Sequence, residues 1–249
     1  MSEQQPPASN PPAPATSGTA KGAIEVHELT RVQVLIARRA AESRATVPAF
    51  EAGVEVDMEA CLELRAGRKA EGGSPVPTIT DLVVKACAIA LREHPRLNGA
   101  YRDARFELHE RVNVGVMVAA TDALYTPVLP DTDSLPLDEI SSRLRAAVER
   151  VRSGAITAAE LSGGTFTVSN LGMHGVSRFG AVITPPQAAI LAVGAVTPRA
   201  VVRDGEVVAR HVMDVTLACD HRIVYGVDAA GFLARIRGLL EAPAGALAQ

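Results

Sequence analysis

The triplet Asp220-His221-Arg222 has residue types suited to proton transfer. It follows the strand-like run VTLAC and precedes Gly226 and a helical segment. A histidine at the end of a strand can project its ring into a cleft while its backbone stays fixed, and an imidazole with an ordinary pKa of about 6.5 can take and return a proton near neutral pH. His221 is therefore a candidate general base. A half-buried structural histidine would show the same local pattern.

A second candidate cluster lies in residues 163–196, where a strand-like run ends in Ser169-Asn170 and enters a Gly-rich turn. This arrangement displays a hydroxyl at the mouth of a loop, where it could donate to an oxyanion. The alternative is that both residues merely bond to nearby backbone in a turn. No GxSxG elbow is present, which disfavours a serine nucleophile of the hydrolase type. His174, in the same loop, is expected to be solvated.

The elements that would position these residues follow from hydrophobic periodicity and from the turn and cap signals. Helices are predicted at 28–44, 58–70, about 78–94, 136–153 and 228–241. Strands are predicted at 47–56, 112–119, 125–129, 165–169, 188–197, 200–202 and 206–219, with Asp204-Gly205 as the strongest hairpin signal. Helices and strands do not alternate regularly, so we expect an α+β fold around a large mixed sheet rather than a doubly wound parallel sheet.

Composition narrows the function classes. Of the 249 residues, 47% are hydrophobic and 21% charged, and the net charge is −3, which provides no basic field for nucleic acid. Cys61, Cys87 and Cys219 are odd in number and lie in apolar runs, which disfavours disulfides and a metal cluster. The sequence begins without a signal-peptide pattern and has no apolar run of membrane-span length, so we expect a soluble, cytoplasmic protein without a membrane partner. Residues 1–22 are Pro/Ala-rich and are predicted to be a disordered tail, leaving residues 23–249 as the catalytic domain.

Several segments together resemble a known family. GGTFTVSNLGMHGV, PPQAAILAVGAV and ACDHRIVYGVDAAGF are similar to the catalytic domain of the dihydrolipoyl acyltransferases of 2-oxoacid dehydrogenase complexes, which share a fold with chloramphenicol acetyltransferase. IARRAAES, VPAFEAGVEVDM, ITDLVVKACAIALREHPRLNGAY, VNVGVMVAA and TPVLPDTDSLPLDEI fall in the same order as in the family. The resemblance covers about residues 24–249.

The resemblance implies direct acyl transfer from a coenzyme A thioester to a thiol or hydroxyl, without an acyl-enzyme, a metal or a bound lipoyl group. His221 would be the general base and Ser169 the hydroxyl that stabilises the oxyanion. The supporting or acceptor-site residues would be Tyr225, Asn170, Asp220, Arg222 and Gly226. In the family the site lies in a tunnel between subunits of a trimer, so a homotrimer or a larger assembly is expected.

The sequence also departs from the family pattern. Tyr225 stands where an acidic or amide residue is expected, Ala49 replaces a frequent histidine, and Tyr125 enters the run ALYTPV. With Met1 as the natural start there would be no lipoyl or subunit-binding domain, which favours a stand-alone acetyltransferase for a small or carrier-bound alcohol such as a hydroxymethyl tetronate. The first alternative is the core of a 2-oxoacid dehydrogenase complex that acylates dihydrolipoamide. The second is a non-catalytic assembly core in which Tyr225 marks a dead site.

Overall fold

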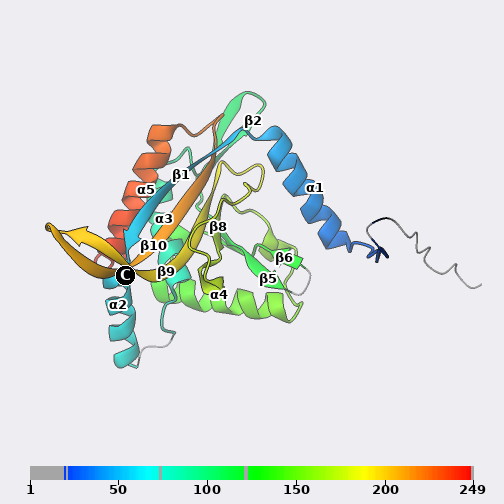
Figure 1. Ribbon diagram of the computed structural model, residues 1–249. Coiled ribbons are helices and arrows are strands. Elements are labelled where there is room, and N and C mark those ends of the chain that lie inside the picture. Colours follow the sequence, from blue (N-terminus) through cyan, green and yellow to red (C-terminus); the bar gives the residue numbers. More distant parts are fainter. Residues whose placement is uncertain (1–19, 21, 73–74, 121–122, 248–249) are drawn as a thin grey trace, which may run out of the picture.

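A six-stranded mixed sheet forms the centre of the computed structural model, which describes residues 20, 22–72, 75–120 and 123–247 (Figure 1). The strand order is β1-β10-β9-β8-β4-β7. The strands are β1 (Ala49–Asp57), β4 (Val114–Val116), β7 (Val128–Leu129), β8 (Phe166–Asn170), β9 (Ala189–Arg203) and β10 (Glu206–Asp220). The β4–β8 and β8–β9 pairs are parallel and the other pairs antiparallel. The predicted α+β fold around a large mixed sheet is confirmed.

Five α-helices are described, and each matches a predicted helix to within a few residues: α1 (Arg31–Thr46), α2 (Glu59–Ala70), α3 (Ile79–Glu93), α4 (Leu137–Arg152) and α5 (Gly226–Glu241). Thr78 caps α3, because its hydroxyl accepts from the Asp81 amide while the Asp81 carboxylate accepts from the Thr78 amide. Helix α5 begins before the predicted start at Asp228. The N-cap of the helix is Tyr225, and Asp228 lies three residues inside the helix, where its carboxylate accepts from the Tyr225 amide at 3.0 Å.

The two faces of the sheet are covered differently, since successive side chains of a strand point to opposite faces. Helices α3 and α5 cover one face, where Leu82, Phe232 and Leu217 belong to the main hydrophobic core (Figure 1). The other face carries a smaller cluster that includes Ile183, Ile190 and Ala218. It is closed by the loop that follows β8 and by the end of α1, where the Ser43 hydroxyl donates to the Ile183 carbonyl at 2.6 Å.

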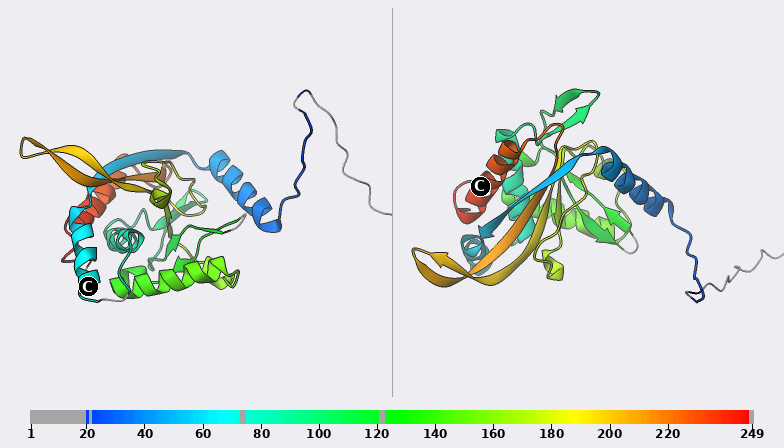
Figure 2. Two further views of the ribbon diagram at one scale, coloured as in Figure 1. Left: turned by 60° about the horizontal axis from the view of Figure 1, so that its bottom comes forward. Right: turned by 45° about the horizontal axis from the view of Figure 1, so that its top comes forward.

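The outer halves of β9 and β10 leave the sheet as a two-stranded arm (Figures 1 and 2). The predicted strands 188–197 and 200–202 form one continuous strand, β9, which runs through Pro198. A proline is tolerated there because β9 pairs with β8 only as far as Val193, so the edge of β9 at Pro198 that faces away from β10 has no partner strand. On that unpaired edge a residue without an N–H loses no ladder hydrogen bond. The Asp204-Gly205 turn has positive φ at both residues, 53° and 86°, as predicted for this hairpin.

A second hairpin, β2 (Gly99–Arg102) and β3 (Arg105–Leu108), was not predicted. Its turn is Asp103-Ala104, with φ of 49° and 59°, so an alanine occupies a left-handed position at which glycine or asparagine would have signalled the turn. The predicted strand 112–119 is also divided, into β4 and β5 (Val118–Ala120). The strand predicted at 125–129 corresponds to β6 (Ala123–Tyr125), paired with β5, and to β7.

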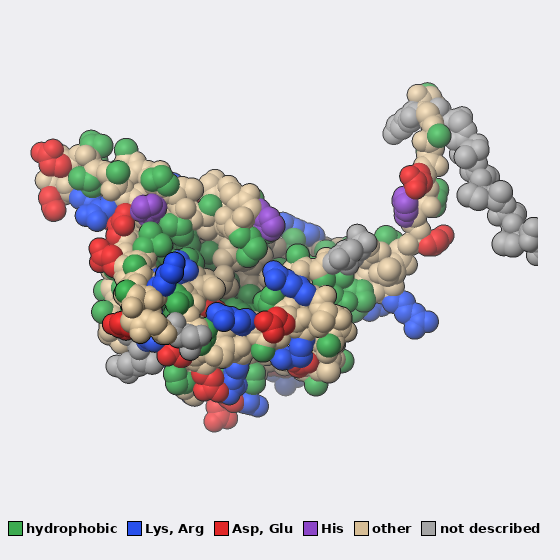
Figure 3. Space-filling model, turned by 90° about the horizontal axis from the view of Figure 1, so that it is seen from below, with side chains coloured by type: hydrophobic (Ala, Val, Ile, Leu, Met, Phe, Trp, Pro, Cys, Tyr) green, Lys and Arg blue, Asp and Glu red, His purple; other side chains and the backbone are tan. Residues whose placement is uncertain are grey.

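The underside of the molecule is hollowed, with Lys and Arg side chains along the border of the hollow and hydrophobic side chains within it (Figure 3). Among the described residues, no helix combines the length and the apolar character that crossing a bilayer requires. Of the predicted tail, residues 1–22, only Ala20 and Gly22 fall within the described part.

Candidate active site

His221 directly follows β10, at the edge where β10 meets the start of β1. Its amide donates to the Pro48 carbonyl at 3.0 Å, which anchors the backbone just beyond the last sheet pair, Ala49 with Asp220. The imidazole lies between two aromatic rings: the Phe50 centroid is 4.8 Å from its own and the Tyr225 centroid 6.1 Å. The side chain is exposed. The backbone of His221 is thus held in place and its side chain is exposed, while its role as a base stays a prediction.

Asp220 and Arg222 form a tight ion pair around the histidine. The buried Asp220 carboxylate accepts from the Arg222 amide at 3.0 Å, from Nε at 2.9 Å and from Nη2 at 2.7 Å. The hydrogen bond to Asp220 raises the pKa of the Arg222 guanidinium above its usual range. These bonds close the turn that contains His221 and leave the imidazole free for chemistry.

Removing this carboxylate should loosen the turn. We expect Asp220→Ala to lower the free energy of unfolding by about 2–3 kcal/mol, because it strips a partly buried guanidinium and a backbone amide of their shared acceptor. Asp220→Asn should cost less, since it keeps an oxygen for the Arg222 amide. Urea denaturation of both variants measures the difference, and equal loss in the two would show that the retained oxygen contributes nothing.

Cys219, which immediately precedes this turn, is not a candidate nucleophile. Its side chain is fully buried on the helix-covered face of the sheet, and burial raises the pKa of the thiol to about 12. A thiol with such a pKa holds almost no thiolate at neutral pH.

Ser169 and Asn170 face opposite sides of the sheet. Ser169 lies in register with Ala192 of β9 and Thr216 of β10, on the face covered by the loop after β8, and is 7% exposed. Asn170 points to the helix-covered face, where its amide donates to the Thr80 hydroxyl at 2.9 Å and its oxygen accepts from the Gly172 amide at 2.7 Å. Asn170 therefore ties β8 to α3 and to the following turn and does not lie beside Ser169.

A single chain does not bring His221 and Ser169 together. Ser169 lies level with Thr216, two strands away in the sheet, and His221 follows the end of β10, five residues beyond Thr216. With strands about 4.8 Å apart and a rise of about 3.3 Å per residue, the two Cα atoms are roughly 19 Å apart. Neither side chain can reach a carbonyl group held by the other. One copy of the chain therefore does not place both side chains in a single site.

Tyr225 caps the start of α5 beside His221 and is 42% exposed. The guanidinium carbon of Arg96 lies 5.1 Å from the centre of the tyrosine ring. Arg96 also forms an ion pair with Asp228 at 3.3 Å. Sequence reasoning did not identify Arg96 as part of this neighbourhood, since it follows Pro95 in a helix-ending segment with no motif of its own. Gly226, a predicted supporting residue, is the first residue of α5.

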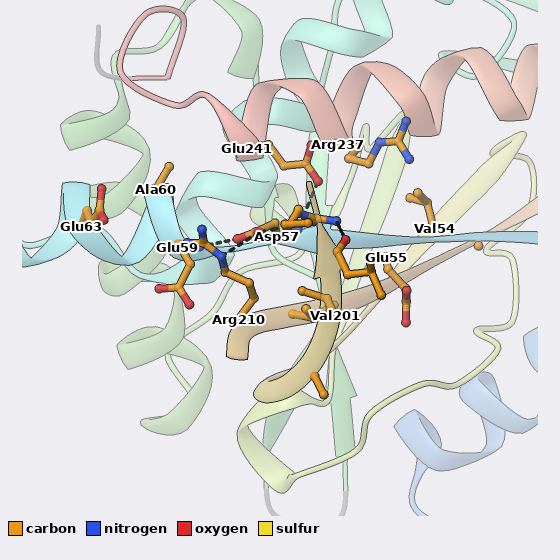
Figure 4. Close-up of a pocket in the computed structure, with 15 residues that line it drawn as sticks. Val54, Glu55, Asp57, Glu59, Ala60, Glu63, Val201, Arg210, Arg237 and Glu241 are labelled. Carbon is orange, nitrogen blue, oxygen red and sulfur yellow. Dashed lines mark hydrogen bonds and ion pairs between the residues drawn. The ribbon is translucent and has the colours of Figure 1, made fainter. Parts of the chain in front are cut away.

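A groove with a volume of about 1020 Å³ lies elsewhere, at the base of the β9–β10 arm. Figure 4 shows charged side chains around it. Asp57 forms ion pairs with Arg203 and Arg210. None of the predicted site residues lines it. The groove is therefore separate from the His221 turn and from Ser169.

Comparison with known proteins identifies the family. The model of the 2-oxoacid dehydrogenases acyltransferase catalytic domain matches residues 21–248. The chain is 35% identical over 216 residues to a Rickettsia bellii protein named dihydrolipoyllysine-residue acetyltransferase component of pyruvate dehydrogenase complex, covering 86% of this chain and 52% of that protein. The chain thus spans about half the length of the curated relatives it matches.

Solved structures agree. The dihydrolipoamide acetyltransferase of Azotobacter vinelandii, whose structure was used to study a serine, a histidine and an asparagine in its catalytic mechanism, superposes with a TM-score of 0.88 at 28% identity, covering 95% of this chain and 99% of that one. The cubic core of a pyruvate dehydrogenase multienzyme complex has the same TM-score, identity and coverage. Chloramphenicol acetyltransferase, with a TM-score of 0.50 at 15% identity, covering 82% of this chain and 94% of that one, shares the fold alone.

The motifs around Ser169 and His221, the fold and the match over almost the whole chain agree: this chain belongs to the acyltransferase family of the 2-oxoacid dehydrogenases.

Proposed function

We propose that the chain transfers an acetyl group between coenzyme A and the thiol of a dihydrolipoyl group. The observation that carries the proposal is the placement of His221 and Ser169. In the Azotobacter vinelandii enzyme, the serine and the histidine under study are separated by the same number of residues as Ser169 and His221. The named relatives are acetyltransferases of dihydrolipoyllysine residues, which supports a thiol acceptor.

The proposed reaction is a direct transfer. His221 takes the proton from the acceptor thiol, whose sulfur attacks the thioester carbonyl of acetyl-coenzyme A. The carbonyl oxygen becomes an oxyanion, and the Ser169 hydroxyl donates a hydrogen bond to it. Removing one preorganised donor of this kind raises the activation free energy by about 3 kcal/mol. When the intermediate collapses, the C–S bond to coenzyme A breaks and His221 returns its proton to the leaving sulfur. The products are the acetylated acceptor and free coenzyme A.

The distance within one chain supports a shared site. Because Ser169 and His221 lie roughly 19 Å apart in one copy, we propose that the histidine of one copy works with the serine of the next in a ring of identical subunits. A homotrimer is the simplest such ring for this family. Larger assembly, as in the cubic core described above, is compatible with this arrangement.

The acceptor expected from the sequence, a hydroxymethyl tetronate or a similar primary alcohol, finds no support in the relatives described above. Of the three departures from the family pattern that favour it, Tyr225, Tyr125 and Ala49, Tyr225 is the one beside His221: it stands four residues after the histidine, where the Azotobacter vinelandii enzyme has the asparagine. Changes at supporting positions are weaker evidence about the acceptor than the relatives' shared activity on dihydrolipoyllysine residues. The thiol acceptor is therefore the better-supported proposal.

Competition between the two acceptors tests this proposal. With acetyl-coenzyme A and equal concentrations of dihydrolipoamide and a hydroxymethyl tetronate in one tube, we expect the thioester product to form at least about tenfold faster than the ester. Mass spectrometry resolves the two products. Faster formation of the ester would instead assign the protein to alcohol acetylation.

A further inference from the structure

The β2–β3 hairpin contacts the turn that holds His221 through two arginines. Tyr101 and Phe106 are directly paired across the hairpin, so their rings lie on the same face. The Arg222 guanidinium lies 4.5 Å from the centre of the Tyr101 ring, and that of Arg96 lies 5.7 Å from the centre of the Phe106 ring. Both distances are within the range at which a cation is attracted to an aromatic face. Figure 1 shows the hairpin at the top of the molecule, beside the start of α5.

Arg96 joins this hairpin to Tyr225. Its guanidinium contacts both aromatic rings, Phe106 and Tyr225, and is also paired with Asp228 at 3.3 Å. The same Asp228 oxygen accepts from the Tyr225 amide at 3.0 Å. The backbone and the ring of Tyr225 are thus held by one connected pair, Arg96 and Asp228. A guanidinium held by a carboxylate and two rings has little freedom to leave, although its side chain is 40% exposed.

The Tyr225 ring in turn limits where the His221 ring can lie. The His221 ring has Phe50 at 4.8 Å and Tyr225 at 6.1 Å, tilted by 53° and 52°. Phe50 belongs to β1 and is fixed by sheet pairing with Cys219. Tyr225 lies at the exposed start of a helix, and its side chain is the more mobile of the two by position. Whatever fixes Tyr225 therefore fixes that side of the imidazole.

We propose that Arg96 is a positioning residue for His221 and acts through the aromatic ring of Tyr225. The inference rests on the proposed role of His221 as the base. In this arrangement ring stacking against Arg96 replaces a polar side chain at position 225, and the phenolic hydroxyl has no part in it. Misplacement of a reacting group by about 1 Å can cost up to about 100-fold in rate, so a contact of this kind can affect turnover without touching the substrate.

Substitutions at both positions test the contact. We expect Arg96→Gln and Tyr225→Leu each to lower kcat about tenfold while KM for acetyl-coenzyme A changes by less than about twofold, because substrate contacts remain. Tyr225→Phe should keep kcat near wild type, since it keeps the ring. Arg96→Lys should have a kcat closer to that of the wild type than to that of Arg96→Gln, since it keeps a cation. The double variant Arg96→Gln/Tyr225→Leu should be no slower than the slower single variant, because the two act in one chain of contacts.

Arg235→Gln is the matched control. Arg235 of α5, like Arg96, forms an ion pair, here with Glu93 at 2.9 Å, and its side chain is likewise 40% exposed. Within the described structure, the hydrogen bonds and ion pair of the Arg235 side chain go to Glu93 and not to the His221 turn. We expect this control to leave kcat unchanged. Thermal melting of every variant checks that each one is folded.

The His221→Ala background separates the two proposals. There, adding Arg96→Gln should leave the residual rate unchanged, because the group that Arg96 positions is gone. If His221→Ala itself keeps its activity, the proposed function fails. If His221→Ala is inactive but Arg96→Gln matches Arg235→Gln, only the positioning role is wrong. A Tyr225→Phe variant as slow as Tyr225→Leu would also overturn it, by assigning the role to the hydroxyl.

Discussion

His221→Ala should lower the rate of acetyl transfer by at least about 100-fold while the protein stays folded. Positioned acid–base catalysis contributes about 10²–10⁴-fold to the rate. No other described residue of the turn can replace His221 as the base for the acceptor thiol, because Arg222 is held as a cation by Asp220 and the Cys219 thiol is buried. Release of free coenzyme A, followed with a thiol reagent at saturating substrates, measures the rate. The described ring contacts of the imidazole are with Phe50 and Tyr225, and the backbone hydrogen bond to Pro48 is kept, so the melting temperature should change little.

His174→Ala is the matched control for this experiment. His174 is an exposed histidine in the turn after β8, and its replacement should leave turnover at the wild-type level. Near wild-type turnover in His221→Ala would remove the histidine from the mechanism. A wild-type protein that itself releases no coenzyme A would instead support the second alternative raised by its sequence, a non-catalytic assembly core.

A mixture of two inactive variants should regain activity if the site is shared between copies. His221→Ala and Ser169→Ala should each be strongly impaired alone, by at least about 100-fold and about 10- to 1000-fold in kcat. After dissociation and reassembly of a 1:1 mixture, a ring in which each site takes its histidine from one copy and its serine from the next should have about a quarter of its sites intact. The regained rate should therefore approach a quarter of that of reassembled wild type.

A second mixture makes the result decisive. Wild type mixed 1:1 with the double variant His221→Ala/Ser169→Ala should also give about a quarter if the site is shared, but about half if both residues of a site come from one chain. In the second case the mixture of single variants gains nothing. Equal activity of the two mixtures thus supports the shared site. Half of the wild-type activity in the mixture with the double variant, together with no activity in the mixture of single variants, contradicts it.

The sequence predicts the elements around the site better than the contacts within it. Helix α3 and the Asp204-Gly205 turn are local: a threonine with an aspartate three residues later, or an Asp-Gly pair, satisfies its own backbone within a few residues. The end of β10 at Asp220 could likewise be placed, because a run of apolar residues ends there. The strand position of Ser169 was correct for the same reason.

The contacts that were missed depend on residues far apart in the chain. Asn170 follows Ser169 directly, but the alternation of a strand turns it to the opposite face, where Thr80 of α3 is its partner. Arg96 meets Tyr225 only because the β2–β3 hairpin and the start of α5 lie side by side, and the hairpin itself was hidden by an alanine in a left-handed turn position. Periodicity has no access to such pairings, since it describes one element at a time.

The place of β1 in the sheet has a consequence for how the chain folds. β1 pairs with β10 alone, so the first described strand cannot join the sheet until β10, the last described strand, has formed. Closing so long a loop is entropically costly and places this sheet among the slowly folding topologies. During synthesis the β1 segment leaves the ribosome long before its partner exists. Its free edge is a place where a nascent chain could pair with the wrong strand until the residues that precede His221 have been made.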